Sequence, residues 1–69
     1  MSGFIEIKIQ EHLDKKWQDR FEGMTIRYQQ NQTIMEGRPK DQAHLHGILN
    51  LIRDLNLKLI SVIVMEPNP

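Results

Sequence analysis

Apolar and polar positions alternate in the first residues of the chain. In "FIEIKIQEH" every second residue from Ile5 to Ile9 is an isoleucine, and charged or amide residues lie between them. This period of two, carried by β-branched residues, is typical of a strand with one buried face. The same period returns in "MTIRY", and "TIMEG" and "LKLISVIVM" are further apolar segments bounded by turn residues. The pattern therefore predicts four strands.

The segment after the first strand has the spacing of a short helix. In "LDKKWQDRFEG" the residues Leu13, Trp17 and Phe21 recur every four positions and share one helical face. Asp14 suits the N-cap, and Gly23 suits the left-handed position that ends a helix. Two lysines at the positive end of the helix dipole weaken this helix.

A second and longer helix is expected at about residues 42–55. Asp41 suits its N-cap, and Asn56 can take the left-handed position after its last turn. Its apolar stripe consists of Leu45, Ile48, Leu49, Ile52 and Leu55.

The order strand, helix, strand, strand, helix, strand predicts a two-layer α+β fold. We expect the ferredoxin-like βαββαβ arrangement, with an antiparallel sheet and both helices on one of its faces. A single domain is expected over residues 1–66, followed by a C-terminal tail at residues 67–69. The predicted core contains Ile5, Ile7, Ile9, Ile26, Leu45, Leu49 and Ile52, covered by Trp17 and Phe21 from the first helix.

Composition and charge argue against several classes of protein. The 69 residues include no cysteine, so disulfides and thiolate metal sites are excluded. Nine basic and nine acidic residues cancel and are interspersed, which does not favour a nucleic-acid partner. An RNA-recognition sheet would carry stacking aromatic residues on its central strands, and "TIMEG" has none. The longest apolar run is too short to span a bilayer, and "MSG" does not begin a signal peptide. We therefore expect a cytoplasmic protein without cofactor, nucleic-acid partner or membrane contact.

Several short segments resemble a group of small uncharacterised bacterial and archaeal proteins of about this length. These segments are "DQAHLHG", "IRDL" and "LISV", and the likeness extends from Ile5 to Val62. The resemblance implies a self-contained domain and no particular chemistry.

The histidines do not have the spacing of a metal site on a helix. His44 and His46 are two residues apart, so they point about 200° away from each other on a regular helix. No cluster of carboxylates completes a ligand set with them or with His12. An enzyme that uses His46 for proton transfer is a third hypothesis, but no nucleophile or second carboxylate accompanies it. The sequence therefore favours a protein without catalytic activity.

Gly47 is unusual because it lies inside the second helix. A glycine there costs roughly 1 kcal/mol of helix stability relative to alanine. Ala43 shares its face of the helix, and two small residues four apart permit another element to approach closely. We favour a tolerated surface glycine, and a contact surface remains the alternative.

The last strand provides the main functional hypothesis. "LISVIVM" is apolar on both faces, although helices on one side of a sheet cover only one face. We expect a binding or assembly module that forms a homodimer through the sheet. Its predicted interface is Phe4, Ile60, Val62 and Val64. A local contact with Phe4 or the tail is the other interpretation of this apolar strand.

The start of the second helix provides an alternative function. Backbone N–H groups at a helix N-terminus bind anions, and basic residues precede this helix. A small-ligand regulatory domain would use Arg38, Lys40, Gln42 and His46.

Overall fold

The computed structural model describes residues 3–65. The expected tail at residues 67–69 lies outside the described residues. The elements are β1 (Phe4–Ile9), η1 (Lys15–Arg20), β2 (Met24–Gln29), β3 (Gln32–Gly37), α1 (Gln42–Asp54) and β4 (Leu59–Met65).

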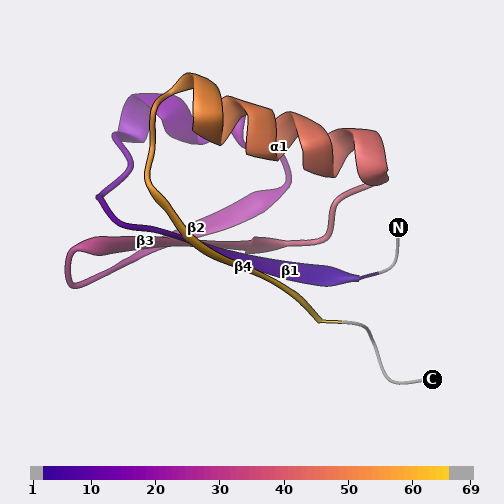
Figure 1. Cartoon of the computed structure of the whole chain (residues 1–69), viewed down its shortest axis with the longest axis horizontal. Coiled ribbons are helices and arrows are strands. Elements are labelled where there is room, and N and C mark those ends of the chain that lie inside the picture. Colours follow the sequence, from indigo (N-terminus) through magenta and orange to yellow (C-terminus); the bar gives the residue numbers. More distant parts are fainter. Residues whose placement is uncertain (1–2, 66–69) are drawn as a thin grey trace.

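The four strands form one antiparallel sheet in the order β2-β3-β1-β4. Figure 1 shows α1 and η1 on the same side of this sheet. The predicted α+β class and the four strands are therefore confirmed. The strand order places β2 at one edge and β4 at the other.

The first helical segment differs from its prediction. Instead of an α-helix there is the 3₁₀-helix η1, six residues long, with Asp14 as its N-cap. Leu13 and Phe21 are buried on either side of it, and Trp17 is half-buried. Six residues make too few hydrogen bonds to offset the cost of starting an α-helix, and the two lysines at its start oppose the dipole. The spacing of four thus identified the apolar positions correctly but gave the wrong helix type.

Both ends of α1 are closed by the residues that the sequence indicated. The Asp41 carboxylate accepts a hydrogen bond of 2.8 Å from the backbone N–H of His44. At the other end Asn56 has the left-handed φ of 57°, and the N–H of Leu57 donates to the carbonyl of Ile52. This pattern is the Schellman motif, which satisfies carbonyls that the helix leaves without partners. Among the described residues no helix is long and apolar enough to cross a membrane.

The core lies between the sheet and the helical layer. β1 runs through the middle of the sheet, and its three isoleucines are fully buried as their alternation predicts. Four other members of the predicted core, Ile26, Leu45, Leu49 and Trp17, pack at the margin and stay partly exposed. The buried cluster contains Ile5, Ile7, Ile9, Leu13, Phe21, Met35, Ile48 and Ile52.

A buried threonine ties the loop after β1 to the β2–β3 hairpin. The Thr33 hydroxyl accepts a hydrogen bond of 2.8 Å from the N–H of Leu13 and donates one of 2.5 Å to the carbonyl of Glu11. From β2, the Tyr28 hydroxyl donates to the carbonyl of Leu13 at 2.6 Å. These bonds satisfy backbone groups of the loop that would otherwise be buried without partners.

Candidate interaction surface

β4 is the most apolar exposed element of the described chain. It forms one edge of the sheet, and six of its seven residues are large apolar side chains. Each of these six side chains is between 37% and 47% exposed. An edge strand also presents unpaired N–H and C=O groups along its outer side. β4 therefore combines exposed apolar side chains with unpaired backbone groups.

Two of the predicted interface residues lie on the helix side of the sheet. Val62 is opposite Ile7 and Val64 is opposite Ile5, and directly opposite residues of an antiparallel pair share a face. The isoleucines of β1 are fully buried, whereas the two valines beside them stay exposed. The helical layer thus covers β1 and leaves this face of β4 largely open.

Phe4, the predicted interface residue on β1, lies on the other face of the sheet from these two valines. Phe4 is opposite Met65, and the next pair on that face is Glu6 with Ile63. Because the side chains of a strand alternate, Phe4 lies on the side of the sheet away from Val62. The sequence analysis placed Phe4 near β4 without assigning it a face, and an interface that includes Phe4 stays a prediction.

Ile60 occupies an irregular position in β4. Ser61 is opposite Lys8 and Leu59 is opposite Ile9, so Ile60 has no direct partner in β1. Such a bulge inserts one extra residue and redirects the neighbouring side chains. Ile60 is 46% exposed at this irregularity.

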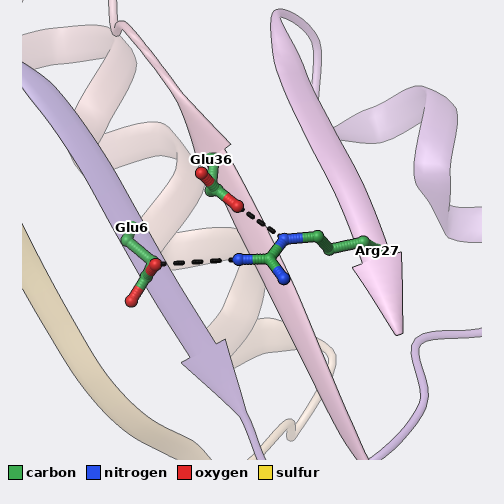
Figure 2. A network of polar contacts seen from close by, with 3 residues as sticks. All are labelled: Glu6, Arg27 and Glu36. Carbon is green, nitrogen blue, oxygen red and sulfur yellow. Dashed lines mark hydrogen bonds and ion pairs between the residues drawn. The ribbon is translucent and has the colours of Figure 1, made fainter. Parts of the chain in front are cut away.

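The face of the sheet away from the helices carries charges over its three other strands. Figure 2 shows Arg27 extending from β2 toward the carboxylates of Glu36 on β3 and Glu6 on β1. Its Nε donates to Glu36 at 2.6 Å, and a terminal nitrogen lies 4.0 Å from Glu6. Glu6 and Glu36 are directly opposite in the sheet, so the guanidinium offsets their repulsion.

Ile34 is a buried exception on this charged face. It is opposite Lys8 on one side and Arg27 on the other, and it is 1% exposed. Long basic side chains cover apolar surface with their methylene groups while their charged ends remain in water. This face therefore presents charge over β2, β3 and β1, and apolar residues at β4.

The residues of the alternative anion site remain at the surface. Arg38, Lys40, Gln42 and His46 are all exposed, and no cavity is found in the described part of the chain. The carboxylate of Asp41 already occupies the N-terminus of α1. An anion there would meet a negative charge, so the geometry gives this hypothesis no support.

His44 has a structural role that its position in the sequence did not indicate. Its Nδ1 accepts a hydrogen bond of 3.0 Å from the N–H of Lys40, and its Nε2 donates to the carbonyl of Glu22 at 3.1 Å. Both nitrogens of a neutral ring are thereby used to join the start of α1 to the turn before β2. His46 is exposed, and the residues described contain no group of three metal-binding side chains.

Gly47 and Gly37 differ in the space around them. A Cβ atom on Gly47 would meet nothing within 4 Å, so Gly47 is the tolerated surface glycine that we favoured. A Cβ atom on Gly37 would lie 2.7 Å from the carbonyl oxygen of Gly23. Gly37 is therefore the position where only a missing side chain permits the observed packing. Beyond the glycine itself, no local pattern of residues predicts this close contact.

Comparison with known proteins relates the chain to a family. A family model described as a domain of unknown function (DUF8691) matches residues 4–63. This match begins with β1 and ends within β4, so it covers three strands completely, most of β4 and both helical segments. It agrees with the expected relationship to an uncharacterised group. No curated protein and no solved structure matches the chain.

Proposed function

The chain belongs to the family of domains described as DUF8691, and we propose that it is a small assembly module that forms a homodimer through the β4 edge. The observation that carries this proposal is the exposure of six apolar side chains, on both faces of one edge strand. Contiguous exposed apolar surface of this kind is typical of an interaction site. A homodimer is the commonest closed assembly, because one surface serves both partners.

A dimer could form by pairing of two β4 edges or by stacking of two sheets face to face. The charged face of the sheet favours edge pairing. Stacking would remove Arg27, Glu6 and Lys8 from water, together with the ion pairs in Figure 2. Burying ion pairs costs more than their attraction returns unless each group gains new partners. Edge pairing adds backbone hydrogen bonds and leaves this network in water.

Small size is a further reason to expect assembly. A 69-residue chain has a limited core, and this one has no disulfide to stabilise it. Burial of the β4 side chains in a dimer would enlarge the apolar area removed from water for each copy.

For the fold, we propose a ferredoxin-like arrangement in which η1 takes the place of the first α-helix. The strand order and the common side of the two helical segments support this relationship. An experimental structure with η1 on the other side of the sheet would refute it.

The dimer is tested by sedimentation equilibrium of the wild-type chain and of a variant with a charge on β4. We expect a wild-type dimer at micromolar concentration and a folded monomer for Val62→Lys, because edge charges oppose strand pairing. The matched control is Thr25→Lys on β2, an exposed residue at the opposite edge, which should remain dimeric. Val64→Lys is a second variant at the same edge in case Val62→Lys does not fold.

Two results would overturn the proposal. One is a wild-type monomer at several hundred micromolar. The other is a dimer that persists in a folded Val62→Lys or Val64→Lys variant. Circular dichroism establishes that each variant is folded before its mass is interpreted.

A further inference from the structure

We infer that the dimer interface extends from β4 onto one flank of α1, formed by Leu45 and Leu49. The α1 helices of the two copies would then pack against each other over the paired β4 strands. This inference rests on the proposed homodimer and adds a second element to its interface. It requires that the two β4 edges pair antiparallel into one sheet, and it does not specify their register.

The side chains of β4 alone supply less surface than a stable dimer buries. Full burial of a valine, leucine or isoleucine side chain removes on the order of 100 Å² of apolar surface from water. The six apolar side chains of β4 are each less than half exposed, so burying them removes on the order of 300 Å² per copy. Stable interfaces bury about 800 Å² per partner. A second surface beside β4 must therefore take part, and the ion pairs on the charged face disfavour that face.

His44 shows which flank of α1 faces β2. Its Nε2 donates to the carbonyl of Glu22, in the turn before β2, and a Cβ atom on Gly23 would lie 3.5 Å from its ring. β2 and β4 are the opposite edges of the sheet. The flank of α1 that is turned away from His44 therefore faces the β4 edge. In Figure 1, α1 lies in front of η1 and β4 lies in front of β1, on the same side of the molecule.

Leu45 and Leu49 form this flank. Successive residues of an α-helix are rotated by about 100°, which places Leu45 about 100° and Leu49 about 140° from His44. The buried Ile48 and Ile52 point between these directions, toward the sheet. Leu45 and Leu49 pack against the core cluster but remain half-buried. Exposed apolar surface therefore continues from the helix side of β4 onto α1.

Edge pairing brings the two flanks together. Two antiparallel edge strands of one continuous sheet are related by a two-fold axis perpendicular to that sheet, so both α1 helices lie on the same side of it. The β1 strands of the two copies are then roughly 14 Å apart, with both β4 strands between them. Helices in contact have axes about 8–10 Å apart, so large side chains are needed to close the space between two helices that cover β1. The leucines of the α1 flank supply them.

Substitution of Leu49 by glutamine tests this contact. Leu49→Gln places an amide in the proposed contact of both copies, so we expect the dimer dissociation constant to rise roughly tenfold or more in sedimentation equilibrium. The matched control is Leu51→Gln, because Leu51 is also half-buried against the core but lies on the flank of His44. It should lower the melting temperature as Leu49→Gln does and leave the dissociation constant unchanged. Leu45→Gln is the second variant if Leu49→Gln does not fold.

The outcomes separate the contact of α1 from the dimer itself. If the wild type is dimeric and a folded Leu49→Gln or Leu45→Gln variant associates as tightly, the contact of α1 is refuted and the dimer through β4 stands. Equal weakening by Leu51→Gln would assign the effect to lost core packing and would also refute the contact. A monomeric wild type overturns both proposals.

Nuclear Overhauser effects between an isotope-labelled and an unlabelled copy provide a test without any substitution. We expect intermolecular effects from the methyl groups of Leu45 or Leu49 in the wild-type dimer. Intermolecular effects from β4 alone would overturn the contact of α1 and leave the dimer in place.

Discussion

The two edges of the sheet differ in what they present to solvent. Polar side chains alternate with apolar ones along β2. Its Arg27 forms ion pairs with carboxylates on β3 and β1. Its exposed aromatic residue, Tyr28, uses its hydroxyl to bond the backbone of Leu13. β4 has no charged residue between Leu59 and Met65 and no comparable side-chain bond among the described residues. One edge thus carries a charge and is bonded to neighbouring segments through its side chains, whereas the other is apolar and exposed.

The difference between β2 and β4 concerns how each edge strand is protected from pairing with other molecules. Edge strands avoid unwanted pairing by means of charges, short length or bulges. β2 uses a charge, and β4 has only the irregularity beside Ile60. An apolar strand without charges on an exposed edge is typical of an interface or of a site of aggregation. The following predictions test the contrast between the two edges.

The largest effect is expected in the exchange of backbone amide hydrogens at the two edges. In the proposed dimer the outward N–H groups of β4 gain partners, so they should exchange at least about 100-fold more slowly than in the Val62→Lys monomer. The outward amides of β2 should exchange at the same rate in both proteins. Hydrogen exchange followed by NMR resolves both strands in one experiment. Equal exchange rates for the outward amides of β2 and β4 in the wild type would contradict the proposed difference between the two edges.

Gly37→Ala is expected to disturb the β2 edge without involving β4. The added Cβ atom would lie 2.7 Å from the carbonyl oxygen of Gly23, which is backbone and cannot rotate away. We expect a loss of about 1–3 kcal/mol in the free energy of unfolding, in the range measured for overpacking. Urea denaturation at a fixed protein concentration measures this loss. A change below a few tenths of a kcal/mol would show that the β2–β3 pair shifts easily.

Gly47→Ala tests the surface of α1 as a rival interface. Open space surrounds Gly47, so alanine should raise the free energy of unfolding by about 0.8–1 kcal/mol through helix propensity alone. The dimer dissociation constant should not change. A weaker dimer in this variant would favour the surface formed by Ala43 and Gly47 over β4.

Arg27→Met should have the smallest effect. It leaves Glu6 and Glu36 opposite each other without the guanidinium between them. Arg27 is half exposed, so solvent screening limits the loss of unfolding free energy to about 0.5–1 kcal/mol. Arg53→Met is the control, because the ion pair of Arg53 with Asp54 is more exposed and, at 3.6 Å, longer than the 2.6 Å contact of Arg27 with Glu36. Similar losses in both variants would contradict a special role for the charge on β2.

Sequence patterns identified the features of this fold that depend on neighbouring residues. Alternation gave β1, and the caps Asp41 and Asn56 were confirmed because capping involves residues within one or two turns. The apolar stripe of α1 was also identified, with Ile48 and Ile52 fully buried. In each of these segments the spacing of apolar residues along the sequence matches the side chains that are buried.

Features that depend on distant residues were not identified. Thr33 is buried because its hydroxyl bonds the loop at Glu11, about twenty positions earlier. Ile34 is buried on the charged face by neighbours from two other strands. Which residues of β4 lie on the same side of the sheet as Phe4 depends on a register between strands about sixty residues apart. None of these relationships can be predicted from the pattern of residues within one short segment.

The central position of β1 has a consequence for how the chain folds. Both partners of β1 come from later segments, β3 and β4, and the latter is the most distant strand in the sequence. The β2–β3 hairpin has a two-residue connection and forms from local contacts, whereas every pairing of β1 requires closure of a long loop. During synthesis β1 is made first and receives its last partner only when β4 is complete. The order in which the strands are made is therefore different from the order in which they can pair, and the apolar β4 completes the sheet last.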